Sequence, residues 1–436
     1  MKVGFISLGC SKNLVVTEEI IGLFKKHGYE ITNDASEAEV LLINTCGFIE
    51  SAKKEAIDTI LEMADYKKDK CKYLIVTGCL VQRYEEDLRK EMPEVDLFVS
   101  IKDYDYLWER IDNLINKKDN VDYLNFMDRY ITTGDSMAYL KIAEGCSNYC
   151  TYCAIPYIQG RYVSRDYDEI IKEAKMLAKK GIKELVVIAQ DTTKYGVDLY
   201  GKSRLAELLD DLCKIDGFKW IRFLYSYPES IDDELISVVK KNDKICNYFD
   251  IPIQHIADGI LKRMNRKTTG NDIRNIITKL RKEIPNVILR TTLIVGFPGE
   301  TEEDFKELCE FVKESKFDRL GAFSYSAEDG TPAANFTDQI NESIKEDRRN
   351  KIMELQQSIS TNNLKNKVGK KYECLIENIT EEGEYYIGRS YMDVPSEDGV
   401  IYIENDGTGM INEFVLVEIT DNNEYDLFGK IVKEIS

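Results

Sequence analysis

Short apolar runs alternate with amphipathic helical patterns along the first third of the chain. The runs typical of strands are residues 3–8, 40–44, 73–77 and 95–99. Apolar residues recur at helical spacing over residues 17–27, 51–66, 83–91 and 104–115. Strands that alternate with helices in this way pair in parallel and are covered by the helices. The pattern therefore predicts an open parallel α/β domain over residues 1–122.

The same alternation resumes after a polar connection, which we place at residues 123–134. Six further strands are predicted at residues 138–142, 184–189, 220–225, 249–253, 287–295 and 319–324. Helical patterns follow them at residues 166–180, 204–215, 232–241, 272–283, 302–315 and 342–367. Six such units predict a whole or partial β/α barrel of the TIM type over residues 135–367. Its reactive residues belong at the C-terminal ends of the strands.

The last segment, residues 368–436, has a different pattern. Short runs such as residues 372–377 alternate apolar and polar side chains, and glycine-containing turns at 382–383 and 406–407 separate them. This pattern predicts a small antiparallel β-barrel. Residues 370–436 carry five basic and sixteen acidic residues, a net charge of −11. More than half of the negative charge of the chain is concentrated there.

Charge restricts the classes of partner. The 436 residues include 59 Lys and Arg against 78 Asp and Glu, a formal net charge of −19. An acidic surface repels phosphate backbones, so the balance argues against tight, non-specific nucleic-acid binding. An acidic C-terminal module attracts a basic protein by charge complementarity, although an acidic surface also serves solubility alone.

The cysteines are expected to be thiols. The chain shows neither the basic start and apolar run of a signal peptide nor any stretch of about 18 apolar residues. We therefore expect a cytoplasmic protein without membrane association. Eleven cysteines in a reducing compartment are expected to include metal or redox ligands rather than disulfides.

The strongest local signal is the C-x3-C-x2-C run of Cys146, Cys150 and Cys153, directly after the first barrel strand. Three thiolates on one loop bind three irons of a cubane cluster and leave the fourth iron open. An open coordination position is typical of a catalytic metal site. A structural zinc site is the alternative, but it needs a fourth ligand, and the chain has two histidines, His27 and His255.

A second set of three cysteines is far apart in sequence but shares one setting. Cys10, Cys46 and Cys79 each follow a predicted parallel strand of the first domain. Ligands of open α/β sheets bind at the carboxyl ends of the strands, where these thiols should converge. The alternative is three separately buried cysteines. The remaining five cysteines are interpreted as packing residues: Cys71, Cys213, Cys246, Cys309 and Cys374.

Polar residues at the predicted rim of the barrel are weaker candidates. Gln190 and Asp191 follow the second barrel strand, and His255 follows the fourth. This placement favours contact with a cofactor or a substrate if the barrel forms. Each could equally be a structural polar group.

Taken together, these motifs resemble the radical S-adenosylmethionine methylthiotransferases across essentially the whole chain. The matching segments are SLGCSKNL at 7–14, INTCGFI at 43–49, TGC at 77–79, EGCSNYCTYC at 144–153, AQDTTKYG at 189–196, PIQH at 252–255, GFPGET at 296–301 and RSYMDVP at 389–395. Within this family, the segments favour the branch that modifies an aspartate of a small-subunit ribosomal protein. The resemblance implies that the C-terminal module is TRAM-like.

The resemblance also implies the cofactors and the reaction. Cys146, Cys150 and Cys153 would bind a 4Fe-4S cluster, and Cys10, Cys46 and Cys79 an auxiliary 4Fe-4S cluster, so that all six are catalytic. One S-adenosyl-L-methionine would serve as methyl donor and another as radical source, with Tyr152 beside the adenine. The product would carry a methylthio group on the β-carbon of the aspartate, and an electron donor is required.

Two rival functions remain open at this point. An enzyme of the same family methylthiolates an adenosine of tRNA, which the acidic C-terminal module disfavours. A ribosome-associated module with structural zinc would have no enzymatic activity.

Overall fold

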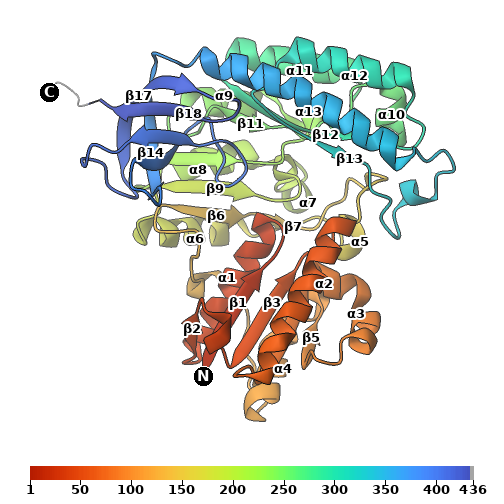
Figure 1. The fold of residues 1–436 in the computed structure, drawn as a ribbon, viewed down its shortest axis with the longest axis vertical. Coiled ribbons are helices and arrows are strands. Elements are labelled where there is room, and N and C mark those ends of the chain that lie inside the picture. Colours follow the sequence, from red (N-terminus) through yellow and green to blue (C-terminus); the bar gives the residue numbers. More distant parts are fainter. Residues whose placement is uncertain (433–436) are drawn as a thin grey trace.

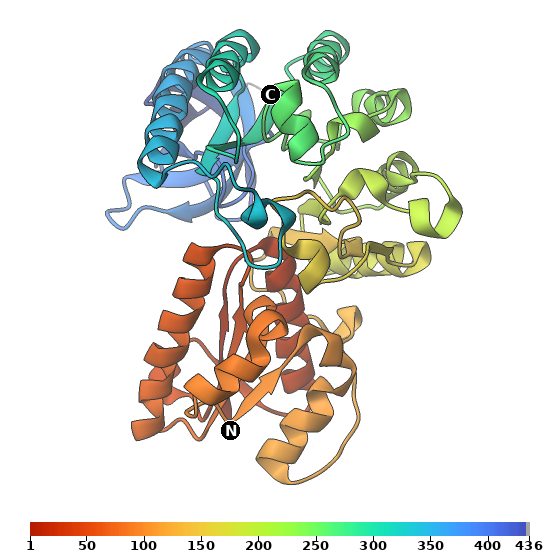
Figure 2. The ribbon, with the colours of Figure 1, turned by 90° about the vertical axis from the view of Figure 1, so that its right-hand side faces the viewer.

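The computed structural model describes residues 1–432. It has three parts: an N-terminal α/β domain, a larger β/α barrel and a small C-terminal β-barrel (Figure 1). In the views of Figures 1 and 2, the N-terminal domain lies below the other two. The last residues of the predicted C-terminal module, 433–436, lie outside the described residues.

A parallel sheet of order β2-β1-β3-β4-β5 forms the centre of the N-terminal domain. Its strands are β1 (Lys2–Ser7), β2 (Glu30–Thr32), β3 (Val40–Thr45), β4 (Tyr73–Gly78) and β5 (Leu97–Val99). Its helices are α1 (Ser11–Lys26), α2 (Glu50–Asp65), α3 (Cys79–Glu91) and α4 (Leu107–Asn116). One apolar core joins the sheet to α2 and α3, and a second joins it to α1 and α4. The predicted open α/β fold is confirmed.

The barrel consists of six parallel strands that form two sheets, β6-β9-β10 and β11-β12-β13. The strands are β6 (Met137–Lys141), β9 (Glu184–Ile188), β10 (Trp220–Phe223), β11 (Tyr248–Asp250), β12 (Ile288–Val295) and β13 (Arg319–Ser324). The two sheets meet at a parallel bridge between Ile221 and Ile245. Within residues 1–432, β6 and β13 do not pair with each other, so the barrel is partial and open on one side.

Helices cover the outside of the barrel, and the apolar core between them and the strands is the largest in the molecule. They are α6 (Tyr167–Lys179), α8 (Leu205–Cys213), α9 (Asp233–Lys241), α11 (Gly270–Glu283), α12 (Glu302–Ser315) and α13 (Glu342–Lys365). Three short helices that the pattern did not predict are α5 (Ile155–Ile158), α7 (Val197–Tyr200) and α10 (Asp258–Arg263). A short hairpin of β7 (Ala143–Glu144) and β8 (Val163–Ser164) frames the cysteine loop.

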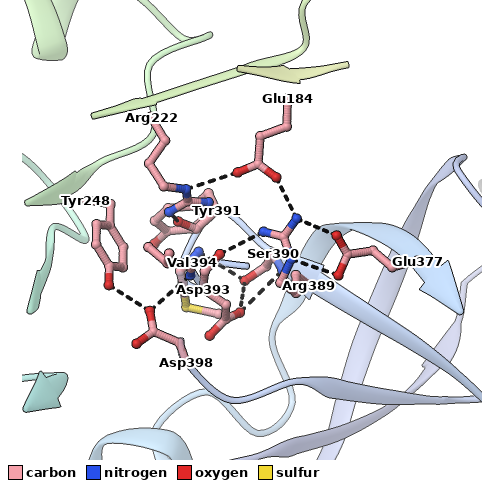
Figure 3. A network of polar contacts seen from close by, with 11 residues as sticks. Glu184, Arg222, Tyr248, Glu377, Arg389, Ser390, Tyr391, Asp393, Val394 and Asp398 are labelled. Atoms are coloured by element: carbon pink, nitrogen blue, oxygen red, sulfur yellow. Dashed lines mark hydrogen bonds and ion pairs between the residues drawn. The ribbon is translucent and has the colours of Figure 1, made fainter. Parts of the chain in front are cut away.

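The C-terminal module is a closed barrel of order β14-β15-β16-β18-β17. Its strands are β14 (Lys371–Ile379), β15 (Tyr385–Ser390), β16 (Ile401–Glu404), β17 (Phe414–Asn422) and β18 (Leu427–Ile431). Hydrogen bonds fix this module to the large barrel (Figure 3). Glu184 of β9 accepts from Arg222 of β10 at 3.0 Å and from Arg389 of β15 at 2.6 Å. The Tyr248 hydroxyl donates to Asp398 at 2.6 Å.

The connection between the first two domains is partly buried. Arg129 lies within it and is completely buried between Glu18 of α1 and Glu173 of α6. The Arg129 side chain donates to Glu18 at 2.7 Å and to Glu173 at 2.9 Å. This segment therefore anchors the two domains to each other.

A second contact joins α2 and α3 to the loop after β13. The Glu328 carboxylate lies 3.2 Å from Lys53 Nζ and 3.5 Å from Arg83 Nη1. It also accepts from the backbone N–H of Glu50 at 2.9 Å.

Among the helices of residues 1–432, none combines the length and the apolar character that a membrane span requires.

Candidate functional site

The three cysteines of the N-terminal domain lie at one edge of its sheet. Cys10 follows β1 and caps α1, Cys46 follows β3, and Cys79 follows β4 as the first residue of α3. Ser7 pairs with Asn44 and Thr45 with Gly78, so these strands end side by side. The structure thus brings together the cysteines that the sequence separates.

Close backbone packing shapes this edge. Gly9 has φ +84°, and a Cβ there would lie 2.6 Å from Cys46 Cβ and 2.8 Å from Cys46 Sγ. Asn13 donates to the carbonyl groups of Leu8 and Thr45 at 3.0 and 2.9 Å, while its Oδ1 lies 4.0 Å from Cys79 Sγ. Glycine and Asn13 therefore fix where the thiols stand relative to one another.

The second triad lies on the loop after β6 and β7. The backbone N–H of Cys146 donates to Gly160, and that of Cys153 donates to Cys150 at 3.0 Å. Asn265, after α10, donates to the carbonyl of Tyr149 at 3.0 Å. Bonds within the loop and one from the segment after α10 thus fix the shape of the loop.

The two triads meet where the domains touch. Cys79 packs with Ala154 and Ile158, which follow Cys153 in the barrel loop. Gln159 Nε2 donates toward Cys79 Sγ at 3.8 Å, and Gln159 Oε1 accepts from Gln190 Nε2 at 3.3 Å. A chain of two amides thus runs from the N-terminal triad to the rim of the barrel.

Burial and neighbouring thiols raise the pKa of four of these cysteines, Cys46, Cys79, Cys146 and Cys153. Burial, with Cys10 and Cys46 nearby, raises the pKa of Cys79 to about 12. Burial also raises the pKa of Cys46 and of Cys146. Burial, followed by the nearby Cys150, raises the pKa of Cys153 as well. In residues 1–432, no group of three or more Cys, His, Asp or Glu side chains is arranged to hold a single metal ion.

A buried arginine lies beside the barrel triad. Arg266 is 7% exposed, and its guanidinium stacks 4.2 Å from the centre of the Tyr227 ring. The Tyr227 hydroxyl in turn lies 3.9 Å from Cys150 Sγ. Arg266 donates to the Pro252 carbonyl at 2.9 Å, but its Nε and Nη1 have no hydrogen-bond partner in the described part of the chain. Two buried donors are therefore available to an anion.

The predicted rim residues have different surroundings. Gln190 is half-buried and faces Gln159. Asp191 is completely buried, and its carboxylate accepts from Asn148 at 2.9 Å and from Thr193 at 2.5 Å. Burial raises the pKa of Asp191. Because Asn148 belongs to the cysteine loop, Asp191 positions that loop.

Tyr152 packs against a small apolar cluster that includes Ala257, two residues after His255. Tyr152 is half-buried and packs with Met264 and Phe297 near the cysteines. His255 is 0% exposed, and its Nδ1 accepts from the backbone N–H of Ala257 at 3.0 Å. Burial lowers the pKa of His255 to about 4. The imidazole is enclosed, with its Nε2 at 3.7 Å from the Glu300 carboxylate, and contact between His255 and a cofactor stays a prediction.

Three functional candidates escaped the sequence interpretation: Lys12, Gln159 and Arg266. Each is a polar side chain without a distinctive spacing in the sequence. Each is recognised as a candidate only by its contact with a residue far away in the chain. Lys12 and Gln159 do lie within or just after the cysteine motifs, which was the one available signal.

Family models match all three parts of the chain. The radical SAM superfamily model matches residues 140–312, which include the barrel triad. An uncharacterized family, UPF0004, matches residues 2–100, and the TRAM domain model matches residues 368–432. The solved structures share the fold: radical S-adenosylmethionine methyltransferase TsrM from Kitasatospora setae aligns with a TM-score of 0.56 at 12% identity over 74% of each chain. The radical enzyme OxsB aligns with a TM-score of 0.51 at 12% identity over 81% of this chain and 56% of its own.

Curated relatives match over the full length. The ribosomal protein uS12 methylthiotransferase RimO of Alkaliphilus oremlandii is 63% identical over 100% of both chains. The proteins of the same name from Clostridioides difficile and Acetivibrio thermocellus are 53% and 50% identical, and each alignment covers 100% of this chain and at least 99% of the relative. With both triads in place and these relatives matched from end to end, the chain belongs to the RimO family of radical SAM methylthiotransferases.

Proposed function

We propose that the chain transfers a methylthio group to the β-carbon of an aspartate in ribosomal protein uS12. S-adenosyl-L-methionine serves both as methyl donor and as radical source. The observation that carries the proposal is the meeting of the two cysteine triads at Gln159 and Cys79. Methylthio transfer requires a radical source and a sulfur carrier within reach of one substrate carbon, and two adjacent triads provide both.

The donor sets fit two 4Fe-4S clusters, with Cys146, Cys150 and Cys153 at the barrel and Cys10, Cys46 and Cys79 at the auxiliary site. Thiols that burial keeps neutral become thiolates when a metal cation compensates their charge. A cubane cluster takes one thiolate per iron, so its ligands stand further apart than the ligands of one zinc. Each site offers three thiols, which suit three irons of a cubane cluster and fall one ligand short of a structural zinc site.

When bound, the barrel cluster supplies one-electron reduction of S-adenosylmethionine, and the auxiliary cluster supplies a site that carries sulfur. The side chains orient and enclose these groups. We assign the carboxylate of S-adenosylmethionine to the free nitrogens of Arg266 and its adenine to the side of Tyr152. Gln190 and Gln159 line the path between the triads, while Asp191 holds the cysteine loop through Asn148.

The partner is a basic ribosomal protein of the cytoplasm, and the acidic C-terminal module binds it. That module exposes acidic side chains such as Glu381, Glu382 and Glu413. They attract Lys- and Arg-rich segments and repel a tRNA backbone. A separate electron donor completes the reaction. Product formation on tRNA, without product on uS12, would replace this proposal with the tRNA function.

Mass spectrometry of uS12 after reaction with the anaerobically reconstituted protein tests the proposal. The wild-type protein should bind about eight irons per chain and add one methylthio group to uS12. The variant that carries Cys10→Ala, Cys46→Ala and Cys79→Ala should retain about four irons and form no product. Wild-type product from this variant would contradict the sulfur-carrying role, and a colourless zinc protein would contradict both clusters.

A further inference from the structure

Lys12 is a buried cation without an anionic partner. It is 6% exposed, in the first turn of α1, two residues after Cys10. Its Nζ lies 3.6 Å from the centre of the Tyr225 ring, beyond the end of β10. Among the described residues, no carboxylate lies within an ion-pair distance of 4.0 Å from Lys12 Nζ, and no hydrogen bond from Nζ to a carboxylate is formed.

Several other buried cations of the molecule differ in this respect. Arg129 pairs with Glu18 and Glu173, Arg222 pairs with Glu184, and Lys345 lies 2.6 Å from Glu342. Removing a charge from water is costly unless an opposite charge compensates it. The carboxylate of Asp250 accepts from the Tyr225 N–H at 3.0 Å and faces Arg290 at 3.4 Å.

Lys12 follows Cys10 of one triad and contacts a barrel residue, Tyr225, that is close in the chain to a contact of the other triad. Tyr225, which contacts Lys12, and Tyr227, which contacts Cys150, are two residues apart, so their Cα atoms lie within about 7 Å. Lys12 itself is joined to Cys10 through a single residue. An anion on Lys12 Nζ would therefore lie close to both triads.

We propose that Lys12 binds the side-chain carboxylate of the substrate aspartate and thereby selects aspartate as the residue to be modified. This inference rests on the proposed function and adds the determinant of substrate specificity. The β-carbon is bonded directly to the carboxylate carbon, so a carboxylate held by Lys12 places the reacting carbon between the triads. The Tyr225 ring holds the ammonium group in place from the other side. A neutral amide would leave the buried ammonium without compensation, which penalises asparagine.

The carboxylate of S-adenosylmethionine is the second source of the same chemistry. Arg266 offers it two free donors on the side of the barrel triad. Lys12 is therefore left to the substrate, and the binding of S-adenosylmethionine should not depend on Lys12.

The test uses the anaerobically reconstituted full chain and two uS12 peptides, one with the target aspartate and one with asparagine in its place. Fluorescence anisotropy of labelled peptides gives their Kd values. Wild type should bind the aspartate peptide about 10-fold or more tightly than the asparagine peptide. Lys12→Met should bind both peptides equally and weakly, whereas Lys12→Arg should recover part of the preference.

The matched control is Lys25→Met on the same helix. Lys25 is exposed and also lies over a tyrosine ring, at 4.0 Å from Tyr130. This variant should keep the wild-type preference for aspartate. Iron content equal to wild type in every variant establishes that the fold and the clusters are intact, and the Kd for S-adenosylmethionine should be unchanged in Lys12→Met.

An unchanged aspartate preference in Lys12→Met, with the methylthio product still formed by wild type, would overturn the inference and leave the proposed function standing. Weaker binding of S-adenosylmethionine with an unchanged peptide preference would also overturn it, because Lys12 would then bind the cofactor. If wild type forms no product on the aspartate peptide and shows no preference for it, the proposed function fails together with the inference.

Discussion

The side-chain amide of Gln159 lies 3.8 Å from the Sγ of Cys79, across the junction of the barrel and the N-terminal domain. Eighty residues of sequence separate the two, and the same amide accepts a hydrogen bond from Gln190. A side chain of the barrel loop thus contacts the thiol of the other triad and helps to fix its position.

Gln159→Ala should lower the yield of methylthio product by about 10-fold or more, because small displacements of reacting groups are costly to rate. Iron content should stay at the wild-type value, since all six cysteines remain. The ratio of 5′-deoxyadenosine to product should rise, and liquid chromatography with mass spectrometry measures both. Gln357→Ala, at an exposed position of α13, is the control. An unchanged ratio in Gln159→Ala would exclude a positioning role.

Gly9→Ala should disturb the auxiliary triad. The new Cβ would meet Cys46 Cβ at 2.6 Å, and the φ of +84° adds backbone strain. We expect iron content to fall toward about half of the wild-type value after reconstitution, as measured by a colorimetric iron assay. Gly28→Ala is a matched control with φ +82° and nothing within 4 Å of the added Cβ. Equal iron loss in both variants would assign the effect to backbone strain alone.

Arg129→Met should destabilise the protein strongly. It leaves the carboxylates of Glu18 and Glu173 buried and deprived of their shared cation. Breaking a buried pair in this way costs about 3–5 kcal/mol, whereas removing the exposed Lys351 from its solvent-screened pair with Asp347 should change the stability little. Urea unfolding of Arg129→Met and Lys351→Met, followed by circular dichroism, compares them. Similar midpoints for the two variants would contradict this account.

His255 should make stability depend on pH. Its pKa is lowered to about 4 by burial, whereas it is near 6.5 in the unfolded chain. Between pH 6.5 and 4, the unfolded chain therefore binds a proton at His255 that the folded chain does not bind. As a result, the free energy of unfolding is unaffected by His255 above pH 6.5 and decreases as the pH falls toward 4. The loss reaches about 3 kcal/mol at most.

His255→Asn removes the titrating group, and its amide oxygen can still accept from the Ala257 N–H. Thermal unfolding of both proteins at pH 7 and pH 5 should show a steeper fall of the melting temperature in wild type. Equal slopes would indicate that folding does not lower the pKa of His255. Carboxylates away from His255 titrate equally in both proteins and cancel in this comparison.

Much of the fold can be predicted from local patterns, because the spacing of apolar residues within a short segment distinguishes a strand from a helix. The runs of the N-terminal domain predict its strands, and the strand ends predict that Cys10, Cys46 and Cys79 share one edge. The helix α1 was predicted to start at residue 17 and begins at Ser11, because it continues directly from the cysteine. The open side of the barrel depends on which strands pair at long range, and local patterns do not determine that pairing.

The remaining site residues could not be predicted for the same reason. Arg266 is one arginine among many until Tyr227 and Cys150 are placed beside it. From the sequence, Lys12 is an ordinary lysine near Cys10, and its burial becomes visible only when α1 packs against the barrel. The motif at 389–395 proves to include the contacts of the C-terminal module with β9 and β10.

The burial of Arg129 also changes what the interdomain segment is. A polar connection is usually where proteases cut and where a chain can be shortened into separate halves. Here a cut beside Arg129 would leave the arginine in one half, so on separation the other half would hold a carboxylate, that of Glu18 or Glu173, without its cation. The first two domains therefore depend on each other for stability. Limited proteolysis should spare the chain at residue 129 and should cleave at exposed neighbours such as Lys117 and Lys118.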